Sequence, residues 1–111
     1  MAKKTPKKKE PYIEKVVDET ILLRRRGAKL REEVWQTHAG KTVRYNLASI
    51  NLRVCRADNV RVLGYDSSHG YHHRHFLGAT EPFEFDSYEA LATRFYQEVQ
   101  ELWKKEDEDN G

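Results

Sequence analysis

Apolar and polar residues alternate through much of the first two thirds of the chain, which is the pattern of half-buried strands. The runs at residues 16–25 and 28–37 flank Arg26 and Gly27, a pair that favours a tight turn, so together they predict a hairpin. In the second run, Leu30 and Val34 fall on one face. The other face carries Arg31, Glu33 and Trp35.

The beginning of the first run fits two kinds of structure. Its apolar positions have a spacing that suits a helix as well as a strand: Ile13, Val16, Val17 and Ile21. We favour a strand from about Glu19, preceded by a segment whose structure the pattern leaves open.

A longer strand is predicted over residues 42–56. Its alternation changes parity near Leu47, which indicates either a β-bulge or a central strand buried on both faces. A further strand follows at residues 60–65, and the Phe83-Glu84-Phe85 segment has the composition of a short strand.

The clearest element is a C-terminal amphipathic helix, because one apolar stripe recurs at helical spacing. The stripe consists of Tyr88, Leu91, Ala92, Phe95, Val99, Leu102 and Trp103. Asp86 is the expected N-cap, with Glu89 as its capping-box partner. The whole pattern predicts an α+β fold: an antiparallel sheet of four to five strands with this helix packed on one face.

Charge is distributed unevenly along the 111 residues. The net charge is only +2, but residues 1–80 carry 17 basic and 8 acidic side chains, whereas residues 81–111 carry 3 and 10. A basic body suits a polyanion, nucleic acid first, although the excess is also what a soluble surface needs. The extreme composition of residues 1–11 and 106–111 predicts a disordered basic tail and a disordered acidic end, leaving one domain at residues 12–105.

The expected location is the cytoplasm, without membrane association. No apolar run approaches the roughly 18 residues of a membrane span, and no apolar stretch follows the N-terminal lysines as in a secretory signal. The single Cys55 cannot pair within the chain and fits a reducing compartment.

Histidine is concentrated in one short segment. Four of the five histidines fall within seven residues: His69, His72, His73 and His75. Metal-free RNA cleavage needs a base for the 2′-hydroxyl proton and an acid for the leaving 5′-oxygen, and imidazole suits both. If residues 71–77 are extended, His73 and His75 share a face with Cβ atoms about 7 Å apart, a separation that can bracket a phosphate. His72 and Arg74 then face the other way.

Charge developing on the phosphate during cleavage calls for a nearby guanidinium. The candidates are Arg74, Arg53 and Arg61. Tyr45, Tyr65 and Tyr71 are candidates for stacking on bases or relaying protons, although aromatic side chains on a sheet more often belong to the core. Two alternatives remain for the histidines: a metal site completed by Asp66 or His69, and a solvated histidine-rich turn without chemistry.

Six features follow one another over about three quarters of the chain, from Ile21 onward. They are a hairpin ending near Val34-Trp35, the strand with Tyr45-Asn46-Leu47, the pair Tyr65-Asp66, the cluster His72-His73-Arg74-His75, Pro82-Phe83-Glu84-Phe85, and the helix start Ser87-Tyr88-Glu89-Ala90-Leu91. This order resembles the TumE family of type II toxins. The chain departs from the family at Gly64, where a basic residue is frequent, and at Ser67, where asparagine is frequent.

The resemblance implies a prokaryotic toxin encoded beside a helix-turn-helix antitoxin and acting on RNA. Its matched polar positions are Asp66, His72, His73 and His75. We therefore expect a ribonuclease-type toxin in which His73 and His75 are acid and base, in either order, and Asp66 orients one imidazole. The alternatives are a non-catalytic nucleic-acid or protein-binding module and a metal-dependent enzyme. Apart from that metal no cofactor is predicted, and a homodimer is compatible with each hypothesis.

Overall fold

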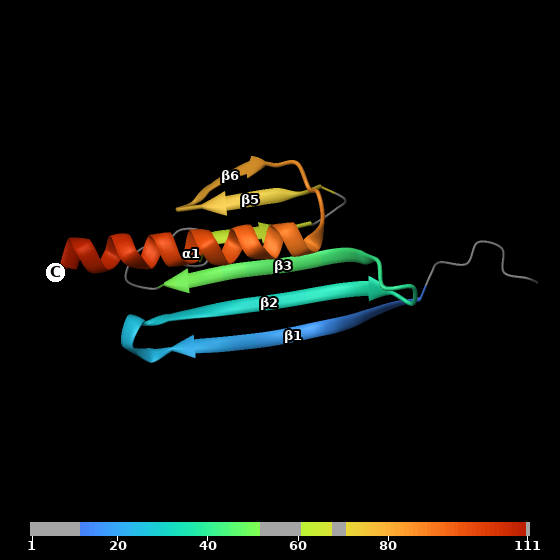
Figure 1. The fold of residues 1–111 in the computed structure, drawn as a ribbon, viewed down its shortest axis with the longest axis horizontal. Helices are drawn as coiled ribbons and strands as arrows, with labels where there is room; N and C mark the ends of the chain where they lie inside the picture. Colours follow the sequence, from blue (N-terminus) through green and yellow to red (C-terminus); the bar gives the residue numbers. More distant parts are fainter. Residues whose placement is uncertain (1–11, 52–60, 68–70, 111) are drawn as a thin grey trace, which may run out of the picture.

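The structure, a computed structural model, describes residues 12–51, 61–67 and 71–110. Six strands form one antiparallel sheet in the order β1-β2-β3-β4-β5-β6, so each strand pairs with its neighbours along the chain (Figure 1). The strands are β1 (Ile13–Leu23), β2 (Ala28–Thr37), β3 (Thr42–Asn51), β4 (Arg61–Asp66), β5 (His73–Phe76) and β6 (Ala79–Pro82). With the C-terminal helix α1 (Tyr88–Asn110), they confirm the predicted α+β class.

The first strand begins earlier than predicted, at Ile13 rather than near Glu19. Its register against β2 shifts between Lys15 and Val17, which leaves Val16 as an extra residue in the strand. A bulge of this kind changes which residues face each side of the sheet. The bulge therefore explains why the apolar spacing here also fitted a helix.

The sheet has one strand more than the upper predicted number. β6 pairs with β5 through a tight turn at Leu77 and Gly78, whose φ angles are 48° and 92°. Positive φ at both central residues is the turn geometry that matches the twist of paired strands. β6 is short and exposed and carries no alternation that would have predicted it. The predicted strand at Phe83-Glu84-Phe85 is wrong, because this segment leaves the sheet and turns Phe83 and Phe85 toward the core.

The parity change near Leu47 comes from burial on both faces of β3. The pairing of β3 with β2 shifts register at Gln36, and its pairing with β4 shifts at Ile50. At Leu47 both pairings continue without a shift, so no bulge lies there. Leu47 and Ala48 point to opposite faces, yet both are buried, as expected of a central strand. Residues 52–56 of the predicted strand lie outside the described segments.

Helix α1 begins one residue later than its predicted cap implies. The Ala90 amide donates to Ser87 Oγ at 3.1 Å, so Ser87 and not Asp86 is the N-cap. The helix continues to Asn110, through most of the end segment predicted to be disordered. At that end, Arg26 contacts Glu106 and Asp107 at 3.5 and 2.9 Å, which gives the acidic segment a partner on the hairpin.

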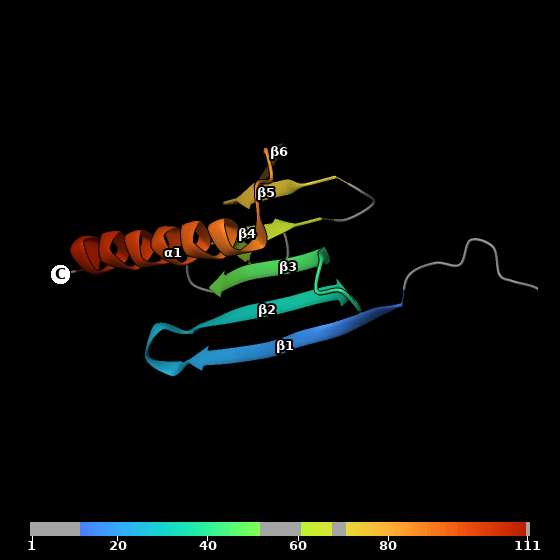
Figure 2. The same ribbon diagram turned by 45° about the vertical axis from the view of Figure 1, so that its right-hand side comes forward.

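The hydrophobic core lies between α1 and one side of the sheet. The sheet contributes Leu30, Tyr45, Leu47, Leu63 and Tyr65 to this core, and the helix contributes Leu91, Phe95 and Val99. The helix lies along β3 and β4 in both views (Figures 1 and 2). We call this side of the sheet the covered face and the opposite side the open face. No helix in the described part of the chain is long and apolar enough to cross a membrane.

Candidate functional site

Strand alternation divides the histidine-rich segment between the two faces of the sheet. In β5, His73 pairs with Asp66 and His75 pairs with Gly64 of β4. Because side chains of alternate residues point to the same side, His73 and His75 meet Asp66 on the open face. Arg74 points to the covered face, where it reaches the helix.

One carboxylate contacts both of these imidazoles. Asp66 Oδ2 lies 2.9 Å from His75 Nε2, and Asp66 Oδ1 lies 3.7 Å from His73 Nδ1. The two imidazole rings are 6.3 Å apart between centroids. The His73 side chain is 32% exposed and the His75 side chain only 13%, so His73 is the more accessible of the two. We call these three residues the Asp66–His73–His75 cluster.

Arg61 adds a positive charge to the cluster. Its guanidinium lies 3.4 Å from Asp66 Oδ2, and its side chain crosses Gly64 to reach that carboxylate. A Cβ at position 64 would lie 2.5 Å from Arg61 Cδ. The glycine that departs from the TumE pattern thus provides the space through which Arg61 reaches Asp66.

The two histidines differ in the freedom of their ring nitrogens. His75 uses both, since Thr80 Oγ1 lies 3.2 Å from Nδ1 while Nε2 faces Asp66. His73 faces Asp66 through Nδ1, and within the described segments its Nε2 has no hydrogen-bond partner. The sequence pattern did not predict Thr80 as a site residue because it did not predict β6. The register of β6 with β5 places Thr80 directly opposite His75.

His72 lies at the covered face, away from the cluster. Its Nδ1 is 2.7 Å from the Tyr45 hydroxyl, and its ring stacks on Phe85 with centroids 4.5 Å apart and planes at 2°. Burial raises the pKa of Tyr45, so its hydroxyl keeps its proton and can donate to His72. The structure therefore gives His72 a packing environment and does not bring it together with His73 and His75.

The predicted role of Tyr65 in base stacking is wrong, because its ring is completely buried. Its hydroxyl donates to Glu98 at 2.6 Å, and burial together with this bond raises the pKa of Tyr65 to about 12. Arg74 joins the same group, with Nε 3.0 Å from the Tyr65 hydroxyl and the guanidinium 3.1 Å from Glu98. Arg74 thus links β5 to α1 and is not the phosphate ligand of the open-face histidines.

The remaining predicted residues have varied positions. Tyr71 is 67% exposed, and its ring centroid lies 6.2 Å from that of His73, so it remains beside the cluster. His38 lies in the turn between β2 and β3, where its ring meets Tyr12. Arg53 and His69 lie outside the described residues. Among the residues that are described, no three His, Cys, Asp or Glu side chains are placed to hold a metal ion.

Comparison with known proteins returned no relative. No family model matches the chain, and no curated protein or solved structure matches it. The likeness to the TumE family accordingly rests on the order of the motifs described above.

Proposed function

We propose that this chain is the toxin of a toxin–antitoxin pair and cleaves RNA at the Asp66–His73–His75 cluster. The observation that supports this most is the position of Asp66, whose carboxylate contacts two imidazoles on the face that α1 leaves open. Structural histidines are usually enclosed by packing, as His72 is. An oriented imidazole with an exposed edge is what proton transfer to a large substrate requires.

In the proposed reaction, His73 is the base. Asp66 faces its Nδ1 and favours the tautomer in which Nε2 accepts a proton. Nε2 takes the proton of an RNA 2′-hydroxyl, whose oxygen attacks the adjacent phosphorus. The bond to the 5′-oxygen breaks, that oxygen takes a proton from His75, and a 2′,3′-cyclic phosphate remains. Arg61 stabilises the negative charge that develops on the phosphate oxygens.

The genetic setting of the proposal comes from the resemblance to the TumE family. It implies a cognate helix-turn-helix antitoxin as partner and a prokaryotic cytoplasm as the place of action. A neighbouring reading frame that encodes a short helix-turn-helix protein would support this part independently of the cluster.

The direct test is expression of His73→Ala in a sensitive host beside the parent. The matched control is His38→Ala, which removes a histidine from a distant turn. The parent and the control should stop growth and should generate RNA fragments ending in 2′,3′-cyclic phosphate. The His73→Ala variant should be folded, as judged by circular dichroism, and should do neither. A folded His73→Ala variant that arrests growth as the parent does would exclude the catalytic role.

A second function, RNA binding without cleavage, is favoured by one observation. Both ring nitrogens of His75 already have partners within the protein, as in a structural histidine. Under this alternative, RNA binding would be salt-sensitive and would persist when His73 and His75 are both replaced by alanine. No new RNA ends would appear with the parent protein.

A further inference from the structure

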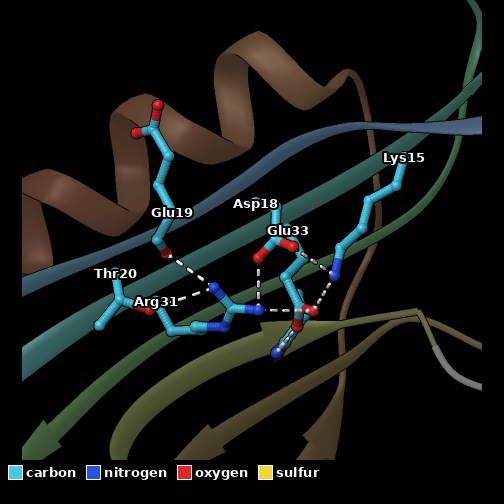
Figure 3. A network of polar contacts seen from close by, with 7 residues as sticks. Lys15, Asp18, Glu19, Thr20, Arg31 and Glu33 are labelled. Carbon is cyan, nitrogen blue, oxygen red and sulfur yellow. Dashed lines mark hydrogen bonds and ion pairs between the residues drawn. The ribbon is translucent and has the colours of Figure 1, made fainter.

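Most charges on the open face are paired with one another. Figure 3 shows Lys15 and Arg31 meeting Asp18 and Glu33 on the side of the sheet away from α1. Lys15 Nζ lies 2.7 Å from Glu33, and Arg31 lies 2.6 Å from Asp18 and 3.0 Å from Glu33. Two cations and two carboxylates thus form one neutral network.

The same network extends to the strand position beside the Asp66–His73–His75 cluster. Asn46 on β3 donates to the second Glu33 oxygen at 2.9 Å and pairs in register with Asp66 on β4. Asp66 in turn contacts Arg61. The two cations and two carboxylates on β1 and β2 therefore balance one another, and a polyanion gains little from these four groups.

Arg44 is different from these cations. It is exposed on the open face of β3, and no carboxylate in the described part of the chain forms an ion pair with it. Its guanidinium carbon lies 4.7 Å from the centroid of the Trp35 ring. The register explains this contact, because Trp35 pairs with Arg44 on one side and with Lys15 on the other.

An arginine held in this way is suited to a phosphate. Stacking on an indole fixes the plane of the guanidinium while its N–H groups remain free to donate, and a guanidinium can bind two phosphate oxygens at once. Ordering the side chain in advance also lowers the entropic cost of binding.

The sheet geometry relates Arg44 to the cluster. Arg44 precedes Asn46 by two residues on the same face, and Asn46 is in register with Asp66 and, across β4, with His73. Strand spacing and rise place the Cα atoms of Arg44 and His73 about 12 Å apart. A short run of nucleotides in an extended strand spans such a distance.

We propose that Arg44, oriented by Trp35, binds a backbone phosphate of a single RNA strand that crosses the open face from β5 toward β2. This proposal rests on the proposed function, because the same RNA strand would place its scissile phosphate at His73. Arg44 would set the direction of the RNA and contribute affinity without touching the reacting atoms.

The test measures binding of a single-stranded RNA carrying 2′-O-methyl groups throughout, which the proposed reaction cannot cleave. Fluorescence anisotropy gives Kd for the parent, Arg44→Ala, Arg44→Lys and Arg94→Ala at several salt concentrations. Arg94 is the control for position: it is also exposed, with its guanidinium carbon 5.6 Å from the centroid of the Tyr65 ring, but it lies on α1 and its Nε is 3.8 Å from a Glu98 oxygen.

Arg44→Ala should raise Kd by about tenfold. It should also reduce the slope of log K against log salt concentration by about one unit, the contribution of one phosphate contact. Arg44→Lys should recover the salt slope but only part of the affinity, since lysine lacks the planar fork. Arg94→Ala should bind as the parent does. Trp35→Leu should weaken binding less than Arg44→Ala, because the charge remains and only its orientation is lost.

Unchanged Kd and salt slope in Arg44→Ala would overturn the proposal, as would an equal loss in Arg94→Ala, which would indicate general charge attraction. These results are independent of catalysis, because the RNA is not cleavable. Failure of the proposed function is seen separately, as cleavage of unmodified RNA by His73→Ala.

Discussion

On the covered face, polar side chains are part of the packing against α1. Arg74 joins Tyr65 to Glu98 of the helix, and Glu32 accepts hydrogen bonds from two helix tyrosines. On the open face, the Asp66–His73–His75 cluster lies on a surface without a covering helix. The two faces belong to the same strands, so the difference arises from side-chain direction alone.

This contrast explains how a run of similar residues acquires different roles. His72, His73, Arg74 and His75 are consecutive, yet two of them stabilise the covered face and two meet on the open face. Neighbours in a strand are separated by the thickness of the sheet. Adjacent histidines in a strand therefore point to opposite faces, whereas histidines two residues apart, such as His73 and His75, lie on the same face.

The largest difference between the faces should appear in stability. Phe95 is completely buried between α1 and the sheet, so Phe95→Ala should lower the free energy of unfolding by about 3–5 kcal/mol. Tyr71→Ala, at an exposed site beside the open-face cluster, should change it by less than about 0.5 kcal/mol. Urea denaturation of both variants measures the difference. Equal effects would contradict the division into a packed and an open face.

A smaller difference is expected within β5 itself. Arg74→Ala leaves Glu98 with one charged partner fewer and should cost about 1.5–3 kcal/mol of stability. His73→Ala, one residue away, should cost less than about 0.5 kcal/mol, because its ring is partly exposed. Thermal unfolding of the two variants checks this, and a larger loss for His73→Ala would refute the assignment of faces.

Because the Arg61 side chain passes over Gly64, substitutions at these two positions should have non-additive effects on the free energy of unfolding. Gly64→Ala should displace Arg61 from Asp66, because the new Cβ would lie 2.5 Å from Arg61 Cδ. We expect a loss of about 1 kcal/mol in the parent, and a clearly smaller loss when Arg61 is already alanine. A double-mutant cycle followed by denaturation gives the coupling. Full additivity would mean that Arg61 does not depend on the space that Gly64 leaves.

The smallest effect concerns acid stability of the open-face network. Hydrogen bonds from Arg31 and Lys15 hold the pKa of Asp18 below its ordinary value of 3.8. Burial would raise the pKa of Glu33, but hydrogen bonds from Asn46 and Lys15 outweigh it and keep the pKa below 4.5. A lowered folded-state pKa contributes stability that is present above the ordinary value and is lost as pH falls through the folded value.

The parent should therefore lose stability as pH falls from 5 to 2, and Asp18→Asn should lose less over the same range. Glu84→Gln, which removes an exposed carboxyl outside the network, serves as control and should follow the parent. Identical acid profiles for the parent and Asp18→Asn would show that these ion pairs are screened by solvent.

Periodicity in the sequence predicted the elements that carry a strong apolar pattern. The helical stripe through Phe95 and Val99 and the alternation in β2 needed no tertiary information, because each amphipathic face specifies its own burial. The shared face of His73 and His75 followed from the same alternation.

The sequence pattern failed where pairing or tertiary contacts decide the structure. The bulge at Val16 depends on the register with β2, and β6 depends on pairing with β5. Both Asp86 and Ser87 are residue types that cap helices, and Ser87 is the one that accepts the hydrogen bond at the start of α1. Tyr65 is buried by residues distant in sequence, and the Arg61 side chain passes over Gly64 because the fold brings them together. Neither contact can be predicted from the sequence pattern alone.

The rate of RNA cleavage by purified His73→Ala, compared with that of His72→Ala under conditions where both are folded, tests the central claim most directly. The account predicts that cleavage by His73→Ala is slower than that of the parent by about a hundredfold or more, because the base at the open face is lost. His72→Ala should retain most of the rate once its lower stability is allowed for. The opposite order, or equal rates for the two variants, would contradict the assignment of the chemistry to the open face.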